Sequence, residues 1–408
     1  MGTTYQVKLG IDGDQPLQTD SAEISKAIEK RLQDINQALS TYLEDSEISR
    51  FNRYPSTDPF AISADFKCVF RRSVEMHQLT DGSFDATVGP LVRLWGFGGA
   101  KPPTRLPSQE DLHECLKRVG TDKVRLVGDS LVKSHPNLEL DFSAIAKGFA
   151  VDEVATIAGK HSRHFLVEIG GEVRTAGKNL ESGKPWAIGV EIPADSPWNP
   201  ASRMAARLEL LGKALATSGD YRNLVKIEDR KFQHTLDPRS GFPVEHGVRS
   251  VSVIEADCMT ADAIATGLMV KPLTEIQAFC KEHNANVFVI FESERGNLDS
   301  WASRSFEGQV LLTTVGQEIP EKNQKAENGG DNPLYLILGT VIVFGLAISG
   351  MAVGVIMSNR QLKGSCGGLS AMAGENQETA SPCSLCTKPA SECSKRADAD
   401  SPREAEHP

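Results

Sequence analysis

A run of about 24 residues without a charged side chain, Leu334 to Met357, divides this 408-residue chain into two unequal parts. As an α-helix, such a run is long enough to cross a bilayer core of roughly 30 Å. A buried helix of a soluble protein is the alternative. The run is rich in glycine, however, and is bounded by Asp331 before it and by Arg360 and Lys363 after it. The sequence therefore predicts one transmembrane helix at residues 334–357.

The residues before and after this run differ in composition. Residues 317–333 are polar and contain a Gly-Gly pair and a proline, which indicates a linker. Residues 358–408 form a short polar tail. Hydrophobic residues make up 40% of the whole chain, enough apolar material for a large core within residues 1–316. We therefore expect a domain at 1–316, a linker, one membrane span and a tail.

Residues 1–316 predict a fold of the α+β class. Asp20 and Glu23 form a capping-box-like helix start, and the apolar residues that follow step by three or four. Runs rich in β-branched residues indicate strands. These runs lie at 123–129, 164–171, 250–257 and 286–293. The net charge of −10 argues against nucleic acid as a partner, because nucleic acid requires a basic face.

Two short segments far apart in the sequence predict a metal and pyrophosphate site. They are DFSAIAKG at 141–148 and ADAIATG at 261–267. In the second, Asp262 and Thr266 are four residues apart, so in a helix their oxygens project from one face. A carboxylate plus a hydroxyl suits Mg²⁺, which keeps few protein ligands and binds water and phosphate oxygens besides. A solvated helix face or a cap is the structural alternative.

The remaining parts of a phosphoryl-transfer site also occur in the sequence. Lys147 can meet a phosphate as a point charge, and Gly148 lets backbone come close. Between the two segments, the string HTLDP places His234 three residues before Asp237. An imidazole titrates near neutral pH, so His234 is a candidate general base, although a lone histidine is more often structural.

These segments belong to a longer series of motifs, by which residues 1 to about 315 resemble the ApbE family of FAD:protein FMN transferases. The matching strings follow one another in order: MGTTY at 1–5, LSTYLEDSEISRFN at 39–52, DGSFDATVGPLVRLWGFG at 81–98, DFSAIAKG at 141–148, EIGGEVRTAGKN at 168–179, ATSGDYRN at 216–223, HTLDPRSGFPV at 234–244 and ADAIATGLMV at 261–270. The resemblance implies a fold of mixed sheets and packed helices.

The resemblance also implies an activity and a metal. Such an enzyme splits the pyrophosphate of FAD, passes FMN to a threonine hydroxyl of an acceptor protein and releases AMP. The family's Mg²⁺ positions fall on Asp262, on Thr266 and on the backbone carbonyl of Ala144. Some members carry a further carboxylate just before that threonine, where this chain has Ala265. An ion at this position is therefore expected to rely more on water or on carbonyl groups.

The resemblance further implies contacts with FAD, and it supports catalytic roles for His234 and Asp237. The flavin contacts fall on Met1, Tyr42, Ser83, Phe84, Asp85, Asp141, Lys147 and the backbone of Leu236. His234 is the candidate base for the acceptor hydroxyl, and Asp237 would orient it. A turn carboxylate ahead of Pro238 is the equally weighted alternative for Asp237.

Four of the eight cysteines lie in the tail: Cys366, Cys383, Cys386 and Cys393. The Cys-x-x-Cys spacing of Cys383 and Cys386 is typical of metal or redox sites, and four thiolates could hold zinc, iron or an iron–sulfur cluster. Disulfides are the structural alternative. The span, the string LKGSCGGL at 362–369 and the Cys-x-x-Cys pair together resemble NqrM, a small membrane protein that matures the Na⁺-translocating NADH:quinone reductase. That resemblance implies iron delivery by the tail and flavin-acceptor subunits of the same reductase as partners.

Members of the ApbE family usually act outside the cytoplasmic membrane. Together with the predicted span, the resemblance therefore implies a single-pass protein of the bacterial inner membrane, with the enzyme domain in the periplasm and the cysteine tail in the cytoplasm. Positive charges on the two sides of the span are nearly balanced, so the positive-inside rule gives little guidance. The chain begins within a family motif, and we expect a longer native chain with an export signal upstream. A reducing cytosol would keep the tail thiols free for metal.

Two other classes of function fit the same residues. The first domain could bind FAD, or hydrolyse it to FMN and AMP, without a protein acceptor. The chain could also be a membrane-tethered metal-binding assembly factor whose flavin site has decayed. Intact Asp262, Thr266, Asp141 and His234 argue against such decay.

Overall fold

The computed structural model describes residues 2–11, 19–193, 204–219 and 224–310. The chain divides into two compact units, residues 1–320 and 321–408, and the described residues all belong to the first. The predicted linker, membrane span and cysteine tail lie outside the described residues. Within the described ranges, no helix is long and apolar enough to cross a bilayer. The predicted helix at 334–357 therefore stays a prediction.

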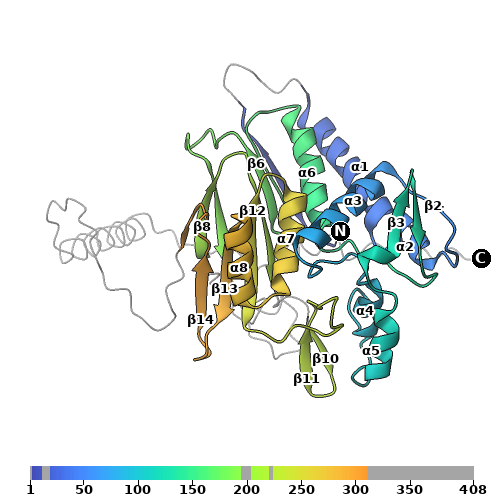
Figure 1. The fold of residues 1–408 in the computed structure, drawn as a ribbon. Coiled ribbons are helices and arrows are strands. Elements are labelled where there is room, and N and C mark those ends of the chain that lie inside the picture. Colours follow the sequence, from blue (N-terminus) through green and yellow to red (C-terminus); the bar gives the residue numbers. More distant parts are fainter. Residues whose placement is uncertain (1, 12–18, 194–203, 220–223, 311–408) are drawn as a thin grey trace, which may run out of the picture. The chain divides into compact units, whose positions relative to one another are not determined.

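A seven-stranded antiparallel sheet forms the centre of the described unit (Figure 1). Its strands, in spatial order, are β1 (Tyr5–Leu9), β5 (Phe165–Ile169), β6 (Glu172–Ala176), β9 (Ala214–Gly219), β12 (Val248–Glu255), β13 (Asn286–Glu292) and β14 (Leu298–Ala302). Three of the four predicted strand runs, 164–171, 250–257 and 286–293, are confirmed here as β5, β12 and β13. The fourth, 123–129, is β3 (Val124–Val127) of a smaller sheet.

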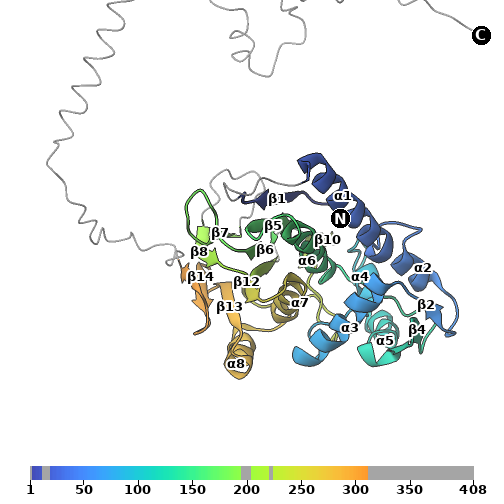
Figure 2. The same ribbon diagram turned by 90° about the horizontal axis from the view of Figure 1, so that it is seen from above.

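Helices gather on one side of this sheet (Figure 2). The helices are α1 (Ser21–Leu39), α2 (Glu47–Arg53), α3 (Ala64–Leu79), α4 (Gly89–Leu94), α5 (Gln109–Leu116), α6 (Ala146–Gly159), α7 (Cys258–Met269) and α8 (Leu273–His283). Helix α6 packs on β5 and β6, and α7 packs on β9 and β12. The predicted helix start is confirmed: Asp20 caps α1 by accepting from the Ala22 N–H at 3.1 Å.

The two faces of the central sheet have separate apolar cores because successive strand residues point to opposite faces. In β13, Val287 and Val289 pack with the helices, whereas Phe288 and Ile290 pack with a three-stranded sheet on the other face. That sheet consists of β7 (Trp186–Glu191), β8 (Met204–Leu210) and β15 (Gly308–Val310). The arrangement has three layers: helices, the central sheet and the smaller sheet. The expected α+β fold is confirmed.

Two further small sheets lie beside the helical layer. One contains β2 (Phe60–Ala61), β4 (Ser130–Lys133) and β3. The 3₁₀ turn η1 (Thr121–Lys123) directly precedes β3. The other is the hairpin β10 (Leu224–Ile227) and β11 (Arg230–Gln233). The segment from His234 to Val244 follows β11 directly, so this hairpin positions the predicted base.

Candidate functional site

The two segments that predicted a metal site meet where α6 and α7 cross. Asp262 lies in the middle of α7 and is 2% exposed. Its Oδ2 accepts the Gly148 backbone N–H at 3.0 Å, and its Oδ1 lies 3.4 Å from Lys147 Nζ. A Cβ atom at Gly148 would lie 2.3 Å from the Cys258 carbonyl oxygen. Glycine is therefore required there, because it lets the two helices approach closely enough for this contact.

The metal-site prediction required a helix around Asp262 and Thr266, and both residues lie in α7. Thr266 is one turn beyond Asp262, and its Oγ1 lies 3.0 Å from Ser218 Oγ on β9. Ala265 is fully buried in the main core, so its methyl group offers no ligand atom. Ala144 lies two residues before α6 and is partly buried. Side-chain oxygens for an ion thus come from α7 itself.

Glu172 is a third member of this cluster, and sequence reasoning missed it. It begins β6, directly after a turn in which Gly170 and Gly171 have φ values of +64° and +106°. Its side chain is 2% exposed, and Oε1 accepts a hydrogen bond from Lys147 Nζ. Its Oε2 is buried and has no hydrogen-bond partner among the described residues. Only its place in the string EIGGEVRTAGKN marked it in the sequence.

The charges in this cluster do not balance. Two buried carboxylates, Asp262 and Glu172, face the single ammonium group of Lys147. Burial raises the pKa of Glu172 to about 7, and the Lys147 charge only partly offsets that effect. Burial alone would lower the pKa of Lys147, but the charges of Asp262 and Glu172 outweigh it and the pKa is raised. With both carboxylates ionised, the cluster is one positive charge short.

This shortage and the donor chemistry fit a divalent cation. The carboxylate of Asp262 and the hydroxyl of Thr266 are the hard oxygen ligands that Mg²⁺ prefers. Across the part of the chain that the structure describes, no three His, Cys, Asp or Glu side chains converge on one metal-sized site. A Mg²⁺ ion at Asp262 would therefore take most of its ligands from water, backbone and phosphate oxygens, as this ion commonly does.

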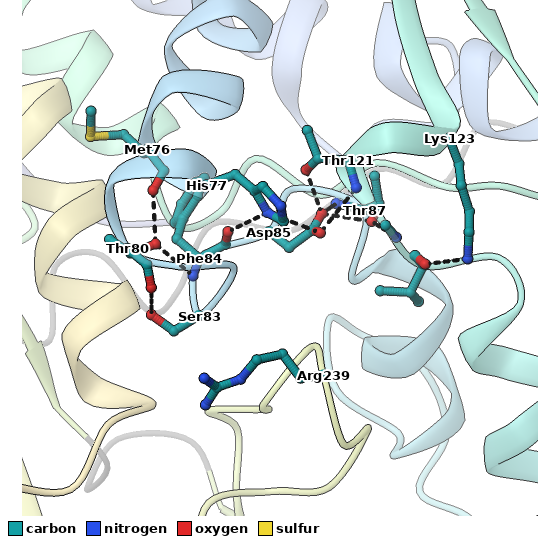
Figure 3. Close-up of polar contacts among 12 residues, drawn as sticks. Met76, His77, Thr80, Ser83, Phe84, Asp85, Thr87, Thr121, Lys123 and Arg239 are labelled. Atoms are coloured by element: carbon teal, nitrogen blue, oxygen red, sulfur yellow. Dashed lines mark hydrogen bonds and ion pairs between the residues drawn. The ribbon is translucent and has the colours of Figure 1, made fainter. Parts of the chain in front are cut away.

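A cavity of about 650 Å³ adjoins the loop between α3 and α4 (Figure 3). Its lining residues are His77, Gln78, Asp81, Gly82, Asp85, Leu116, Val119, Gly120, Pro238 and Arg239. In Figure 3, the Arg239 side chain lies across an open space from the loop that carries Ser83. The polar and charged lining suits a ligand with phosphate, ribose or base groups.

Asp85 is anchored in the wall of this cavity. It is 6% exposed and accepts hydrogen bonds from the Thr87 N–H and hydroxyl, at 2.7 and 2.6 Å, and from the Thr121 N–H and hydroxyl, at 3.1 and 3.0 Å. His77 Nδ1 lies 3.2 Å from Asp85 Oδ2. The predicted flavin contact is thus already bound to three neighbouring residues.

The contact between His77 and Asp85 shifts the pKa values of both side chains. The hydrogen bond to Asp85 raises the pKa of His77, although partial burial acts against it. Burial alone would raise the pKa of Asp85, but hydrogen bonds from His77 and Thr87 outweigh burial and lower it. Each partner therefore favours the charged form of the other.

The other flavin contacts predicted in this loop are also turned into the protein. Ser83 is 2% exposed and donates its hydroxyl to the Thr80 carbonyl at 2.9 Å, and Phe84 is 3% exposed in the main core. A Cβ at Gly267 of α7 would lie 3.1 Å from Phe84 Cβ, so the loop packs directly on the helix that carries Asp262. At Ser83 and Phe84, backbone groups are therefore what the loop can offer a ligand.

Asp141 and Tyr42 lie on different parts of the helical layer. The Asp141 N–H donates to the Ala86 carbonyl at 2.8 Å, which links the segment before α6 to the Asp85 loop. Asp141 Oδ1 accepts the Ser143 N–H at 2.8 Å. Tyr42, between α1 and α2, is 71% exposed, and a Cβ at Gly99 would lie 3.3 Å from its ring. The predicted contact Met1 lies outside the described residues.

His234 immediately follows β11 and is partly buried. The backbone of Leu236 bridges to Pro243, and Asp237 N–H donates to the Phe242 carbonyl at 2.9 Å, so this segment forms a tight hairpin-like turn. The Asp237 carboxylate binds Arg239 through Nε at 2.9 Å and Nη2 at 3.0 Å. Asp237 therefore holds an arginine of the cavity wall, and its role toward His234 stays a prediction.

The polar residues of the site that were not predicted include Glu172, His77, Thr87, Thr121 and Arg239. Arg239 stands two residues after Asp237 in the string HTLDPRSGFPV, so its place in the turn could have suggested it. His77 and Thr121 carry no comparable signal, because they reach Asp85 only through tertiary packing.

The profile described as the ApbE family matches residues 1–291 of this chain. The chain belongs to the ApbE family. An ApbE relative from Haemophilus influenzae, named FAD:protein FMN transferase, is 39% identical over 302 residues, which cover 72% of this chain and 86% of the relative. A solved structure described as flavin transferase ApbE from Vibrio cholerae has a TM-score of 0.67 and 37% identity, covering 75% of this chain and 95% of that chain.

A second ApbE structure shows the same likeness. The apo form of the Pseudomonas stutzeri flavinyl transferase ApbE has a TM-score of 0.67 and 32% identity, and it covers 75% of this chain and 92% of that chain. Beyond the ApbE match, residues 355–405 match a profile described as (Na⁺)-NQR maturation NqrM. Both resemblances expected from the sequence are confirmed.

Proposed function

We propose that this chain transfers FMN from FAD to a hydroxyl group of an acceptor protein and releases AMP. Its first domain is an FAD:protein FMN transferase, the name that its curated ApbE relatives carry. The observation that carries the proposal is the cluster of Asp262, Lys147 and Glu172, which is buried, anionic and one cation short. Such a cluster suits a reaction on a pyrophosphate, since phosphoryl transfer needs mainly positioning and neutralised charge.

The reaction exchanges one phosphorus–oxygen bond for another. The acceptor oxygen bonds to the FMN phosphorus, the bond from that phosphorus to the oxygen of AMP breaks, and the hydroxyl proton leaves to a base. The side chains of Asp262 and Thr266 and the carbonyl of Ala144 would hold Mg²⁺. Ala265 would add no side-chain ligand. When bound, that ion supplies positive charge to the pyrophosphate. The Lys147 side chain is 34% exposed, and its ammonium group, bound to Glu172, is the candidate to meet a phosphate oxygen.

FAD would bind along the path from the α6–α7 crossing to the cavity at Asp85. The Asp141 N–H bond to Ala86 joins these two regions. We assign backbone contacts to Ser83, Phe84 and Leu236, whose side chains are buried. Tyr42, which is exposed, would cover the flavin ring together with Met1, because an aromatic ring and a thioether both pack well on a flat apolar system.

We assign the base role to His234. A partly buried imidazole on the turn after β11 can accept the hydroxyl proton of the acceptor near neutral pH. Asp237, bound to Arg239, would act through the shape of this turn.

The experiment incubates an acceptor subunit with FAD, Mg²⁺ and the full chain, and then views a denaturing gel under ultraviolet light. A fluorescent acceptor band is expected, since the covalent bond to FMN survives denaturation. His234→Ala should weaken that band by about 100-fold or more, as general bases commonly contribute this much. The same variant should keep its affinity for FAD in a binding titration. FMN and AMP in solution with a dark acceptor would instead identify a hydrolase.

The second match supports a proposal for the partners and the location. We propose that the acceptors are subunits of the Na⁺-translocating NADH:quinone reductase, because residues 355–405 match a maturation factor of that enzyme. The tail cysteines Cys366, Cys383, Cys386 and Cys393 would bind iron for delivery to the same enzyme. A span at 334–357 would anchor the chain in the inner membrane, with the transferase domain in the periplasm.

A further inference from the structure

Lys147 is shared unequally between its two carboxylate neighbours. It forms a direct hydrogen bond with Glu172, whereas its Nζ lies 3.4 Å from Asp262 Oδ1, beyond the usual range for a charge-assisted hydrogen bond. The three residues come from three elements: Lys147 from α6, Glu172 from β6 and Asp262 from α7. The ammonium group thus belongs mainly to Glu172.

The position of Glu172 in the fold fixes its carboxylate, and this carboxylate holds the Lys147 ammonium group. The carboxylate is held at the first residue of a central strand, just after a two-glycine turn, and it is almost fully buried. The turn is itself braced, because the Gly171 N–H donates to Glu168 Oε1 at 2.7 Å. A flexible lysine held by a rigid carboxylate has one preferred place.

A lysine without that anchor would move to the other carboxylate. Asp262 already accepts one hydrogen bond from the Gly148 N–H, and an ammonium group in direct contact would neutralise its charge. A divalent ion would then have to displace the lysine before binding. Glu172 therefore affects the affinity of the site for a cation through Lys147. Its Oε2, which has no hydrogen-bond partner in the described part of the chain, adds negative charge beside the site.

We propose that Glu172 is a positioning residue of the cation site, which holds Lys147 back from Asp262 and so leaves Asp262 free for a divalent ion. This inference rests on the proposed function for the identity of the ion as Mg²⁺. The role is distinct from packing, because it acts on metal affinity and requires the lysine. Replacing the Glu172 carboxylate by an amide of the same size should therefore reveal this positioning role.

The test is Glu172→Gln in the full chain, with Mg²⁺ binding measured by calorimetry in the absence of FAD and acceptor. The dissociation constant is expected to rise by about 10- to 100-fold, the range found when residues that orient metal ligands are removed. In the transfer assay, the Mg²⁺ concentration for half-maximal rate should rise likewise. The rate at saturating Mg²⁺ should change by much less. Glu172→Asp, which keeps a carboxylate, should recover part of the affinity.

Two further variants make the outcome decisive. Glu168→Gln removes the same charge near the same turn, and it should leave Mg²⁺ affinity unchanged, since a glutamine oxygen can still accept the Gly171 N–H that braces the turn. In the double variant Glu172→Gln, Lys147→Met, loss of the lysine should return Mg²⁺ affinity toward that of the parent. Unchanged Mg²⁺ affinity in Glu172→Gln, or no recovery in the double variant, overturns the proposal. Calorimetry does not depend on turnover, so a parent chain that binds Mg²⁺ without transferring FMN would refute the function and leave this inference intact.

Discussion

Three buried carboxylates of this protein differ in what their neighbours allow them to do. Asp85 accepts from two threonines and a histidine, so its charge is matched within the fold. Asp262 accepts one backbone N–H and lies beside a lysine at 3.4 Å, so it keeps capacity for another cation. Glu172 binds that lysine with one oxygen and has a second oxygen unpartnered within the described residues. Residue type alone does not separate these roles, because hydrogen bonding and burial set them.

The pair of His77 and Asp85 predicts a dependence of stability on pH. Because the folded pKa of His77 is raised, its contribution is fully present below its ordinary value of 6.5 and is lost as pH rises through the raised value. The folded pKa of Asp85 is lowered, so its contribution is present above 3.8 and is lost as pH falls through the lowered value. The pair therefore stabilises the fold most between these two ordinary values.

The variant His77→Gln tests this dependence, since glutamine can still donate to Asp85 but does not titrate. From pH 6 to pH 9, the melting temperature of the parent should fall more than that of His77→Gln. His113→Gln is the matched control, because His113 is exposed on α5 and should leave the parent curve unchanged. Parallel melting curves for the parent and His77→Gln would contradict the assignment.

At the scale of helices and strands, the sequence predicted where elements lie along the chain better than which elements lie side by side in the fold. The period of apolar residues predicted α1, and β-branched runs predicted β5, β12 and β13, because local spacing reports which face is buried. The spacing of Asp262 and Thr266 was read on the condition that the segment is helical, and it is helical as α7. What local spacing could not show is that β6 begins beside the start of α6. Glu172 was missed for that reason.

The contact between α6 and α7 shows where sequence reasoning was partly right. Gly148 was expected to let backbone approach a ligand, but the structure places the Cys258 carbonyl there, so the glycine serves helix packing. That packing still builds the site, because it brings the Gly148 N–H to Asp262. Similarly, Ser83 and Phe84 were found by motif, but the burial of their side chains depends on the tertiary contact with α7.

At the scale of the whole molecule, the chain joins two matches in one polypeptide, the ApbE family at 1–291 and the NqrM family at 355–405. These fall in the separate units 1–320 and 321–408. In the proposed function, the two parts of the chain carry two maturation activities for one target. If so, each activity should be removable without loss of the other.

Changing Cys383 and Cys386 together to serine tests this separation. FMN transfer should stay at the parent rate, whereas the reductase purified from cells with this variant as the sole copy should lose iron and quinone reduction. Serine is a poor substitute for a thiolate that binds a soft metal. Cys68→Ser, at an exposed position on α3, is the control and should leave iron loading normal. Full iron content with the double variant would return these cysteines to a structural role.

The most direct test of the account is the rate of covalent FMN incorporation into an acceptor by Asp262→Asn, measured against Mg²⁺ concentration. Asparagine keeps the size of the side chain and an oxygen for the Gly148 N–H, so the fold should survive, as a melting curve would verify. Loss of the buried charge should lower the Mg²⁺-dependent rate by about 100-fold or more, the scale of losing a group that stabilises the transition state. The account predicts this loss in a folded variant. Transfer at the parent rate and with the parent's Mg²⁺ dependence would contradict it.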